Sequence, residues 1–284
     1  MLRSLIVVAI AAVAIGCAVQ SKLAGGDQQA PANIGAPVQV ILDTEVQWEA
    51  LNPARGDMSP RAGTLWGDRS AEVPTGFLAK FKDGFSSPPH IHNVTYRAVV
   101  ISGGIHNDDP KAEKMWMGKG SFWTQPRGEV HITAARGETN IALVEIDNGP
   151  YLVKPSAEAF DSGERPVNLD ASNIVWLPIA QQATKNEVAS IASLWGRHQK
   201  GGGSGSFLKL APGFAGIIEA PGTTFHCVVI QGNLTHRSGK GKTLKPGGYF
   251  GADGASAHEI SASLDLETII YIRTNDRFRV IGGS

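Results

Sequence analysis

The feature of this sequence that most constrains its fold is an internal repeat. A shift of 129 residues places the LWG that begins at Leu65 on the LWG that begins at Leu194. The same shift places TYRAVVISG, at Thr95–Gly103, on TFHCVVIQG, at Thr224–Gly232. Matches in one nearly constant register indicate the tandem duplication of a structural unit, so the chain is expected to contain two related domains.

The two domains are expected at residues 38–150 and 165–284. Each contains short runs that are rich in Val, Ile, Phe and Tyr, such as FLAKF, NIALVEI and ETIIYIRT, and such runs are typical of strands. Turn sequences such as KDG, SGG and KPGG separate the runs. The pattern predicts an all-β protein in which each half forms a double-layer antiparallel barrel, or jelly roll.

The first residues have the features of an export signal. Met1–Ser4 is cationic, and Leu5–Ile15 is an unbroken run of small and aliphatic residues that is too short to span a membrane. The run ends in AIGC at Cys17, which resembles a bacterial lipoprotein box. The resemblance implies a signal peptide at residues 1–17 and lipid attachment to Cys17. An ordinary signal peptide, cleaved after Ala18 or a little beyond, is the alternative.

Residues 18–37 are small, polar and proline-containing, and they predict a flexible tether. The protein is therefore expected in the periplasm or cell envelope, in contact with the membrane only through its lipid anchor. The 26 Lys and Arg balance the 26 Asp and Glu without a basic tract, which argues against a nucleic-acid partner. Cys227, which lies in the apolar run CVVIQG, is expected to be a buried small hydrophobic residue without a disulfide partner.

The strongest chemical signal lies in the first half. His90 and His92 are one residue apart, so on a strand their imidazoles share one face, and Tyr96 falls on the same face. His131, on a later strand of the same barrel, can complete a site of three imidazoles. Three neutral imidazoles leave coordination positions open for water or substrate, as in catalytic metal sites. Imidazole does not select one metal, so the expected cofactor is one divalent ion of Fe, Zn, Mn, Ni or Cu.

These spacings resemble the two motifs of the cupin superfamily, G-x5-H-x-H-x3-E-x6-G and G-x5-P-x-G-x2-H-x3-N. Every glycine, the proline and all three histidines stand at the family's spacing, whereas Tyr96 replaces the glutamate and Ala135 the asparagine. With the duplication, the resemblance implies two tandem cupin barrels, each a double-stranded β-helix. SSPPHIHNVTYR, FWTQPRGEVHITA and the export signal together most resemble an exported bicupin family described as a domain of unknown function.

Two further side chains are expected to act at the metal. Tyr96 is either a phenolate ligand or a neutral phenol that donates to bound water or substrate; the donor role is favoured because the free pKa near 10 makes a phenolate costly. Glu129 would share a face with His131 on a strand, as a fourth ligand, an acceptor for a ligand histidine or a general base. His106 is expected in a surface turn, and Trp123 in the core or the pocket wall.

The second half has lost the motif. The repeat places Glu219, Pro221 and Glu259 at the positions of the three histidines, and Phe225 at that of the tyrosine. His258 precedes Glu259, so on a strand the two point to opposite faces. The second barrel is therefore expected to bind no metal and to serve for packing or for shaping the pocket of the first.

The expected function is that of a metal-dependent enzyme that acts on a small molecule, with one active site in the first barrel. Three-histidine cupins resemble dioxygenases, while zinc in the same site would support a hydrolase or isomerase. A non-catalytic envelope sensor or ligand-binding protein with a structural metal is one alternative, and a pseudo-enzyme in which Tyr96 fills the metal position is another. Cupins often pair through barrel edges, which would give a homodimer.

Overall fold

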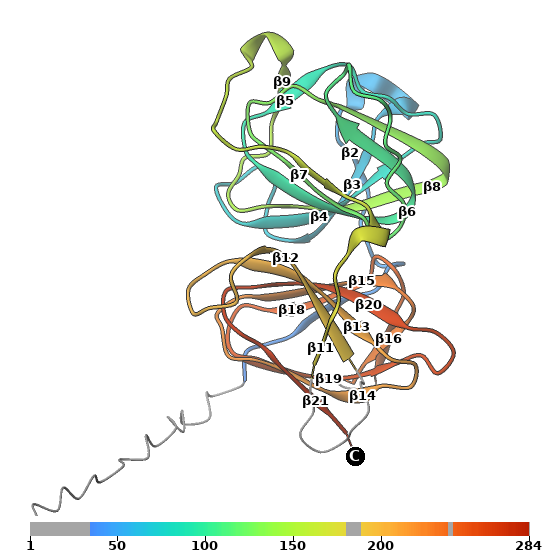
Figure 1. Cartoon of the computed structure of the whole chain (residues 1–284), viewed down its shortest axis with the longest axis vertical. Coiled ribbons are helices and arrows are strands. Elements are labelled where there is room, and N and C mark those ends of the chain that lie inside the picture. Colours follow the sequence, from blue (N-terminus) through green and yellow to red (C-terminus); the bar gives the residue numbers. More distant parts are fainter. Residues whose placement is uncertain (1–34, 180–188, 238–240, 284) are drawn as a thin grey trace, which may run out of the picture. The chain divides into compact units, whose positions relative to one another are not determined.

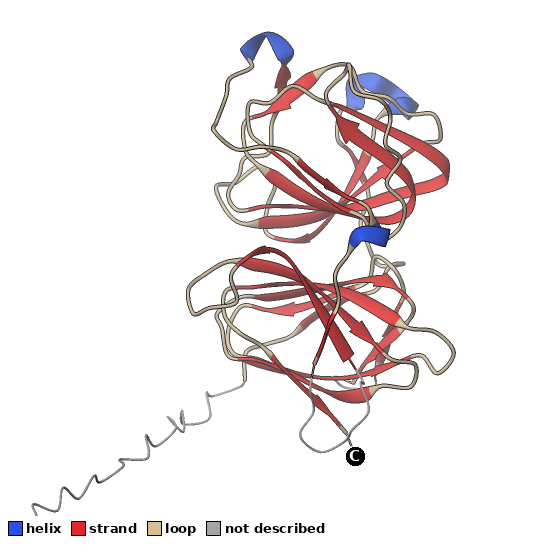
Figure 2. Ribbon diagram, viewed as in Figure 1, coloured by secondary structure: helices blue, strands red, loops and turns tan. Residues whose placement is uncertain are grey.

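The computed structural model of the chain describes residues 35–179, 189–237 and 241–283. The expected signal peptide, Cys17 and nearly all of the tether lie outside the described residues. Strands dominate the fold, as Figure 2 shows. In these ranges the helical elements are three short 3-10 turns: η1 (Pro53–Met58), η2 (Ser156–Glu158) and η3 (Ala171–Asn173). Within the described ranges, no helix is long and apolar enough to cross a membrane.

The first barrel consists of a seven-stranded antiparallel sheet and a two-stranded one (Figure 1). In sheet order, the larger contains β10 (Val167–Leu169), β7 (Phe122–Gln125), β6 (Tyr96–Asp108), β8 (Ile132–Ile146), β4 (Thr75–Phe81), β3 (Arg61–Trp66) and β2 (Glu49–Ala50). The smaller contains β5 (His90–His92) and β9 (Val153–Pro155). The long strands β6 and β8 pair with each other on both sides of Ser102. Bulges around Ser102 let the two strands bend around the barrel.

The second barrel repeats this architecture with a seven-stranded and a five-stranded sheet. The first contains β1 (Gln39–Ile41), β18 (Tyr249–Ala252), β15 (Phe225–Gln231), β20 (Thr268–Thr274), β13 (Ser204–Leu210), β12 (Ala189–Gly196) and β11 (Leu177–Pro178). The second contains β17 (Lys242–Leu244), β16 (Leu234–His236), β19 (Ser256–Ala262), β14 (Ala215–Ala220) and β21 (Arg279–Gly282). The predicted all-β fold, with one antiparallel barrel in each half, is confirmed.

The two halves exchange short strands, which the expected boundaries at 38–150 and 165–284 do not reflect. β1, from the start of the first half, pairs with β18 of the second barrel. β10, from the start of the second half, pairs with β7 of the first barrel. Each exchanged strand covers the open backbone of a strand that would otherwise form the edge of its sheet.

The repeated LWG marks the same irregularity in both barrels. β3 has a bulge between Thr64 and Trp66, and β12 has one between Ser193 and Trp195. A glycine with a φ of 73° follows each bulge: Gly67 comes directly after β3, and Gly196 is the last residue of β12. A Cβ would lie 2.2 Å from the Pro74 carbonyl oxygen at the first position, so the backbone there requires glycine.

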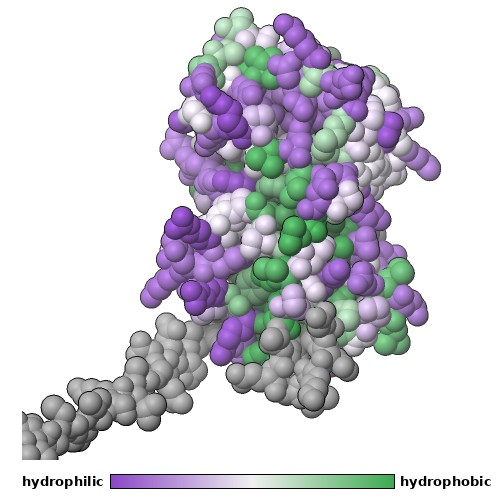
Figure 3. Space-filling model, viewed as in Figure 1, coloured by the Kyte–Doolittle hydropathy of each residue, from purple (hydrophilic) through white to green (hydrophobic). Residues whose placement is uncertain are grey.

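The buried apolar side chains form three clusters. One fills the first barrel and another, which includes Cys227, fills the second, so the prediction of a buried Cys227 is confirmed. A third cluster joins the barrels and includes Trp66 and Phe122 of the first half with Phe207 and Tyr271 of the second. Hydrophilic side chains cover most of the face in Figure 3, with apolar side chains in smaller groups between them.

Candidate metal centre

The structure brings the three predicted histidines together. His90 and His92 are the ends of β5, which places both imidazoles on one face. His131 directly precedes β8 and forms a backbone bridge with His90, with N···O distances of 3.1 and 3.0 Å. One ring nitrogen from each histidine lies within 4.8 Å of the other two. The sequence spacing therefore becomes one compact donor set in the first barrel.

Hydrogen bonds orient each of these imidazoles. The Nδ1 of His90 donates to the Pro88 carbonyl at 2.9 Å, that of His92 to the Leu152 carbonyl at 3.1 Å, and that of His131 to the Glu129 carbonyl at 3.2 Å. Because a donating Nδ1 carries the proton, Nε2 keeps its lone pair.

The protonation states also suit ligation. Burial lowers the pKa of all three histidines, most clearly for His92, and to about 3 for His131. Neutral imidazoles with an unprotonated Nε2 are the form that binds a divalent metal, so these residues fit a metal ion.

Tyr96 lies beside this group on β6, but its hydroxyl proton is used elsewhere. The hydroxyl donates to Asn107 Oδ1 at 2.9 Å, and its oxygen lies 3.5 Å from His131 Nε2. Thr133 donates to the same amide oxygen at 2.8 Å. Burial raises the pKa of Tyr96, so it is a neutral phenol. The expected donation to bound water or substrate therefore competes with a buried hydrogen bond to Asn107.

A second tyrosine, which the sequence analysis missed, also reaches the site. The Tyr151 hydroxyl lies 3.2 Å from His92 Nε2, and its ring stacks on that imidazole with 4.4 Å between centroids. Burial raises the pKa of Tyr151 as well. Tyr151 lies between the two expected domains, outside both cupin motifs. It reaches the histidines because the chain folds back after β8, and β9, which begins two residues after Tyr151, pairs with β5.

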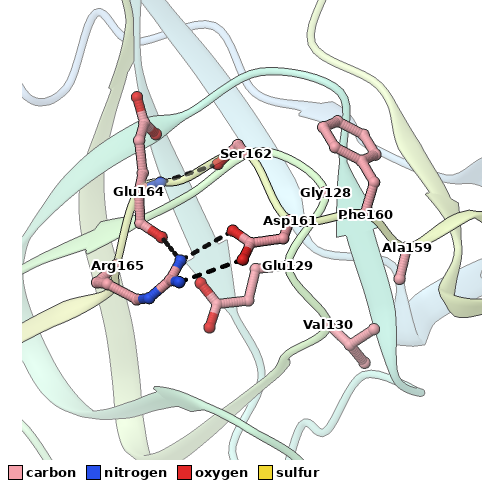
Figure 4. A pocket seen from close by; sticks show the side chains of 9 residues that line it. All are labelled: Gly128, Glu129, Val130, Ala159, Phe160, Asp161, Ser162, Glu164 and Arg165. Atoms are coloured by element: carbon pink, nitrogen blue, oxygen red, sulfur yellow. Dashed lines mark hydrogen bonds and ion pairs between the residues drawn. The ribbon is translucent and has the colours of Figure 1, made fainter.

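Glu129 does not reach the three histidines with its carboxylate. Its side chain lines a separate surface pocket with Asp161 and Arg165, as Figure 4 shows. The segment before His131 is a turn rather than a strand, so the two-residue alternation that predicted a shared face does not apply. Burial raises the pKa of this carboxyl group. Glu129 does orient His131, but through its main-chain carbonyl.

The structure contradicts the expectation for His106 and confirms the one for Trp123. His106 is 1% exposed, so the prediction of a surface turn is wrong. β6 continues through His106 to Asp108, and the ring packs near Trp116 with 6.1 Å between centroids. Trp123 is buried in the core and lines the pocket above the histidines, as predicted. That pocket has a volume of about 580 Å³.

The second barrel differs from the predicted alignment by one residue. His258 pairs with Ile218 as His131 pairs with His90, so His258 is the counterpart of the third histidine. Glu259, predicted at that position, points outward to an ion pair with Arg237 at 3.2 Å.

The other two positions are apolar in the second barrel. Ile218 and Ala220 are buried on β14, whereas Glu219 points away and forms an ion pair with Arg279. His258 Nδ1 lies 3.1 Å from His236 Nε2, and its Nε2 lies 2.9 Å from the Ser256 hydroxyl. The one retained histidine is therefore part of a buried hydrogen-bond chain.

Three solved structures resemble this one over most of both chains. A candidate dioxygenase of Nostoc punctiforme has a TM-score of 0.65 at 17% identity, with 86% of this chain and 84% of that chain covered. The Lactobacillus farciminis oxalate decarboxylase has a TM-score of 0.54 at 10% identity, with 88% and 89% covered. YlbA of E. coli has a TM-score of 0.58 at 13% identity, with 87% and 95% covered. At these identities the likeness establishes the fold alone.

The sequence comparisons identify the family. A comparison with curated proteins gave no significant match. Residues 39–281 match the family model of DUF4437, a domain of unknown function, which covers both barrels. The chain therefore belongs to the DUF4437 family and folds as two tandem cupin barrels.

Proposed function

We propose that the protein binds one divalent metal ion through His90, His92 and His131 and is a metal-dependent enzyme of the dioxygenase type. The observation that carries this proposal is the convergence of three buried, neutral imidazoles whose Nδ1 atoms are all held by main-chain carbonyls. A three-histidine set leaves coordination positions open. The pocket above it is large enough for a small molecule.

The printed descriptions of similar folds support this type of chemistry. One of them is described as a candidate dioxygenase and another as an oxalate decarboxylase. A bound metal would supply Lewis-acid or redox activation of a small oxygenated substrate and, with a redox-active ion, of dioxygen.

The chain's own side chains would then orient the substrate and manage protons. If His92 Nε2 held a metal, it would no longer accept from Tyr151, and the Tyr151 hydroxyl would be free to donate to a substrate oxygen. Tyr96 remains bound to Asn107, whose Nδ2 donates to Gln125 Oε1 at 2.9 Å. Gln125 in turn donates to the Glu129 carbonyl at 3.3 Å. This chain would hold Tyr96 and His131 in one fixed arrangement.

We also propose that the protein acts in the periplasm or cell envelope, anchored by a lipid on Cys17. The support is the sequence of the first 17 residues alone. Mass spectrometry of the mature N-terminus from the native host is expected to find a lipidated Cys17, and an unmodified later N-terminus would contradict the anchor.

Elemental analysis of protein from its native host tests the metal site. We expect about one divalent ion per chain, lost in His92→Ala and retained in His198→Ala, which removes a histidine of the second half. Oxygen uptake against a panel of small oxygenated molecules then tests turnover, and His92→Ala should abolish it with the fold intact. A chain that takes up no metal after reconstitution would contradict the proposal, and a metal-loaded chain without turnover would indicate a binding protein.

A further inference from the structure

The pocket lined by His90 and His92 has an unbalanced positive charge. Its described lining includes Arg55 and Arg69 but no aspartate or glutamate. Arg69 forms an ion pair with Glu49, which balances its charge. Arg55 forms no ion pair within the described part of the chain; its guanidinium donates to the Ser86 carbonyl at 3.4 Å and lies 5.1 Å from the Phe85 ring centre.

Arg55 is positioned to contact a small molecule bound in this pocket. It belongs to η1, whose first turn is capped by Asn52 through a hydrogen bond from the Ala54 amide at 3.1 Å. It lines the same pocket as His90 and His92. A divalent ion bound by three neutral histidines would add further positive charge to a pocket without carboxylates.

Apolar side chains, many of them aromatic, form much of the remaining pocket wall. Its walls include Leu51, Phe77, Phe81, Phe85, Trp123 and Val144. Flat aromatic side chains favour a flat apolar ligand, because offset-stacked and edge-to-face contacts add to the burial of its surface. The volume of about 580 Å³ suits a molecule of one or two rings rather than a two-carbon acid.

We propose that the ligand of this pocket is a small aryl or aryl-alkyl carboxylate. Its carboxylate binds the Arg55 guanidinium, and its apolar body lies between the aromatic walls and extends toward the three histidines. Arginine suits this role because its planar fork donates two parallel hydrogen bonds to a carboxylate. A ligand of this class would be the substrate of the proposed enzyme. The inference depends on the proposed function only in that both concern the same site.

Calorimetric titration of the full mature chain tests the ligand class. Cinnamate and 3-phenylpropionate are compared with cinnamamide and 3-phenylpropionamide, which have the same shape without the charge. We expect at least one carboxylate to bind about tenfold more tightly than its amide, in both metal-free and metal-loaded protein. A preference in the metal-free protein assigns the anion to the arginine rather than to the metal.

Variants then locate the preference. Arg55→Gln should reduce carboxylate affinity to that of the amide and leave amide affinity unchanged, while Arg55→Lys should give an intermediate value. Arg136→Gln is the matched control, because it also removes a guanidinium that packs on an aromatic ring, 4.5 Å from the centre of Trp116. This control should keep the full preference for the carboxylate.

The outcomes separate this proposal from the proposed function. Equal binding of acids and amides to the wild-type chain, or equal losses for both in Arg55→Gln, would overturn the ligand class. Elemental analysis of the same samples reports on the metal independently. A carboxylate preference in a chain that takes up no metal would support the ligand class and contradict the enzyme.

Discussion

At the scale of single residues, the site differs most from the cupin motif in its two tyrosines. Tyr96 stands where the motif has a glutamate, and the structure adds Tyr151 from outside the motif. The hydroxyl of Tyr96 is bound to Asn107, whereas among the described residues the Tyr151 hydroxyl has only His92 as a hydrogen-bond partner. The two phenols are therefore expected to have different roles, structural for Tyr96 and chemical for Tyr151.

Removing the Tyr151 hydroxyl should reduce turnover without loss of metal. Tyr151→Phe keeps the ring that stacks on His92 with an interplanar angle of 18° and removes only the proton donor. We expect kcat to fall by about 100-fold or more, as is typical when a positioned general acid is lost. Elemental analysis and steady-state kinetics on the same samples measure both quantities.

Tyr96→Phe is the comparison for that variant. It removes a buried hydrogen bond to Asn107, whose Oδ1 still accepts from Thr133, so the free energy of unfolding should fall by about 1 kcal/mol. If Tyr96→Phe lost more activity than Tyr151→Phe, the assignment of the two roles would be wrong.

At the scale of elements, the repeated LWG preserves a bulge and the left-handed glycine after it. A bulge changes which residues of β3 and β12 face the core, so it must be kept in register for the Trp66 side chain to reach the cluster between the barrels. The sequence identity at this point is thus explained by backbone geometry.

Gly67→Ala should destabilise the fold strongly. The φ of 73° disfavours any side chain, and the new Cβ would also meet the Pro74 carbonyl oxygen at 2.2 Å. We expect the free energy of unfolding to fall by more than about 2 kcal/mol. Gly118→Ala, where a Cβ meets nothing within 4 Å, should change it by less than about 0.5 kcal/mol. Similar losses in urea denaturation of the two variants would contradict this explanation.

At the scale of the whole molecule, a charge cluster around the buried carboxylate of Glu145 joins the two halves. Glu145 of β8 is 1% exposed and accepts from the Tyr271 hydroxyl at 2.8 Å. Arg273 of β20 lies 3.3 Å from Glu145 and 2.8 Å from Asp147. Arg97 of β6 completes the cluster and lies 2.9 Å from Asp147. Burial raises the pKa of Glu145, and the nearby arginines oppose that shift.

Arg273→Met should destabilise the chain by about 3 kcal/mol, because it leaves Glu145 buried without its nearer cation. Combining it with Glu145→Gln should recover part of the loss. Arg279→Met, which removes an exposed partner of Glu219, is the control and should cost less than about 1 kcal/mol. Equal effects of the two arginine substitutions on urea midpoints would show that the cluster around Glu145 contributes no more to stability than an exposed ion pair.

Two buried histidines outside the metal site predict the response to acid. Burial lowers the pKa of His226 and of His258 to about 3. Between the ordinary histidine pKa of about 6.5 and this value, the unfolded chain binds more protons than the folded one. Stability should therefore fall as the pH drops through this window, by up to about 1.4 kcal/mol per pH unit for each histidine.

His226→Phe tests this pH dependence. The phenyl ring preserves the stack on Trp66, where the centroids are 4.5 Å apart, but cannot take up a proton. The slope of the unfolding free energy against pH is measured by urea denaturation between pH 6.5 and 4. It should decrease by up to about 1.4 kcal/mol per pH unit, which corresponds to one proton fewer taken up on unfolding. An unchanged slope would show that His226 does not titrate on unfolding in this range.

Much of this protein could be predicted from local patterns in the sequence. The repeat and the strand runs determined two antiparallel barrels, and the histidine spacings determined the three-imidazole site, because alternation along a strand fixes which side chains share a face. The prediction that Glu129 shares a face with His131 was wrong, because a turn interrupts the strand there. The repeat alignment was wrong by one residue at His258, because only strand pairing defines the register.

The tertiary structure alone decided the contacts made by segments that return from a distance. The pairing of β9 with β5 brings Tyr151 to His92, and η1 brings Arg55 to the wall of the pocket that His92 also lines. β1 and β10 each pair with a strand of the other half. These contacts depend on where whole segments pack rather than on spacing along the chain. The sequence thus determined the barrels and the histidines, and long-range packing decided which other side chains surround them.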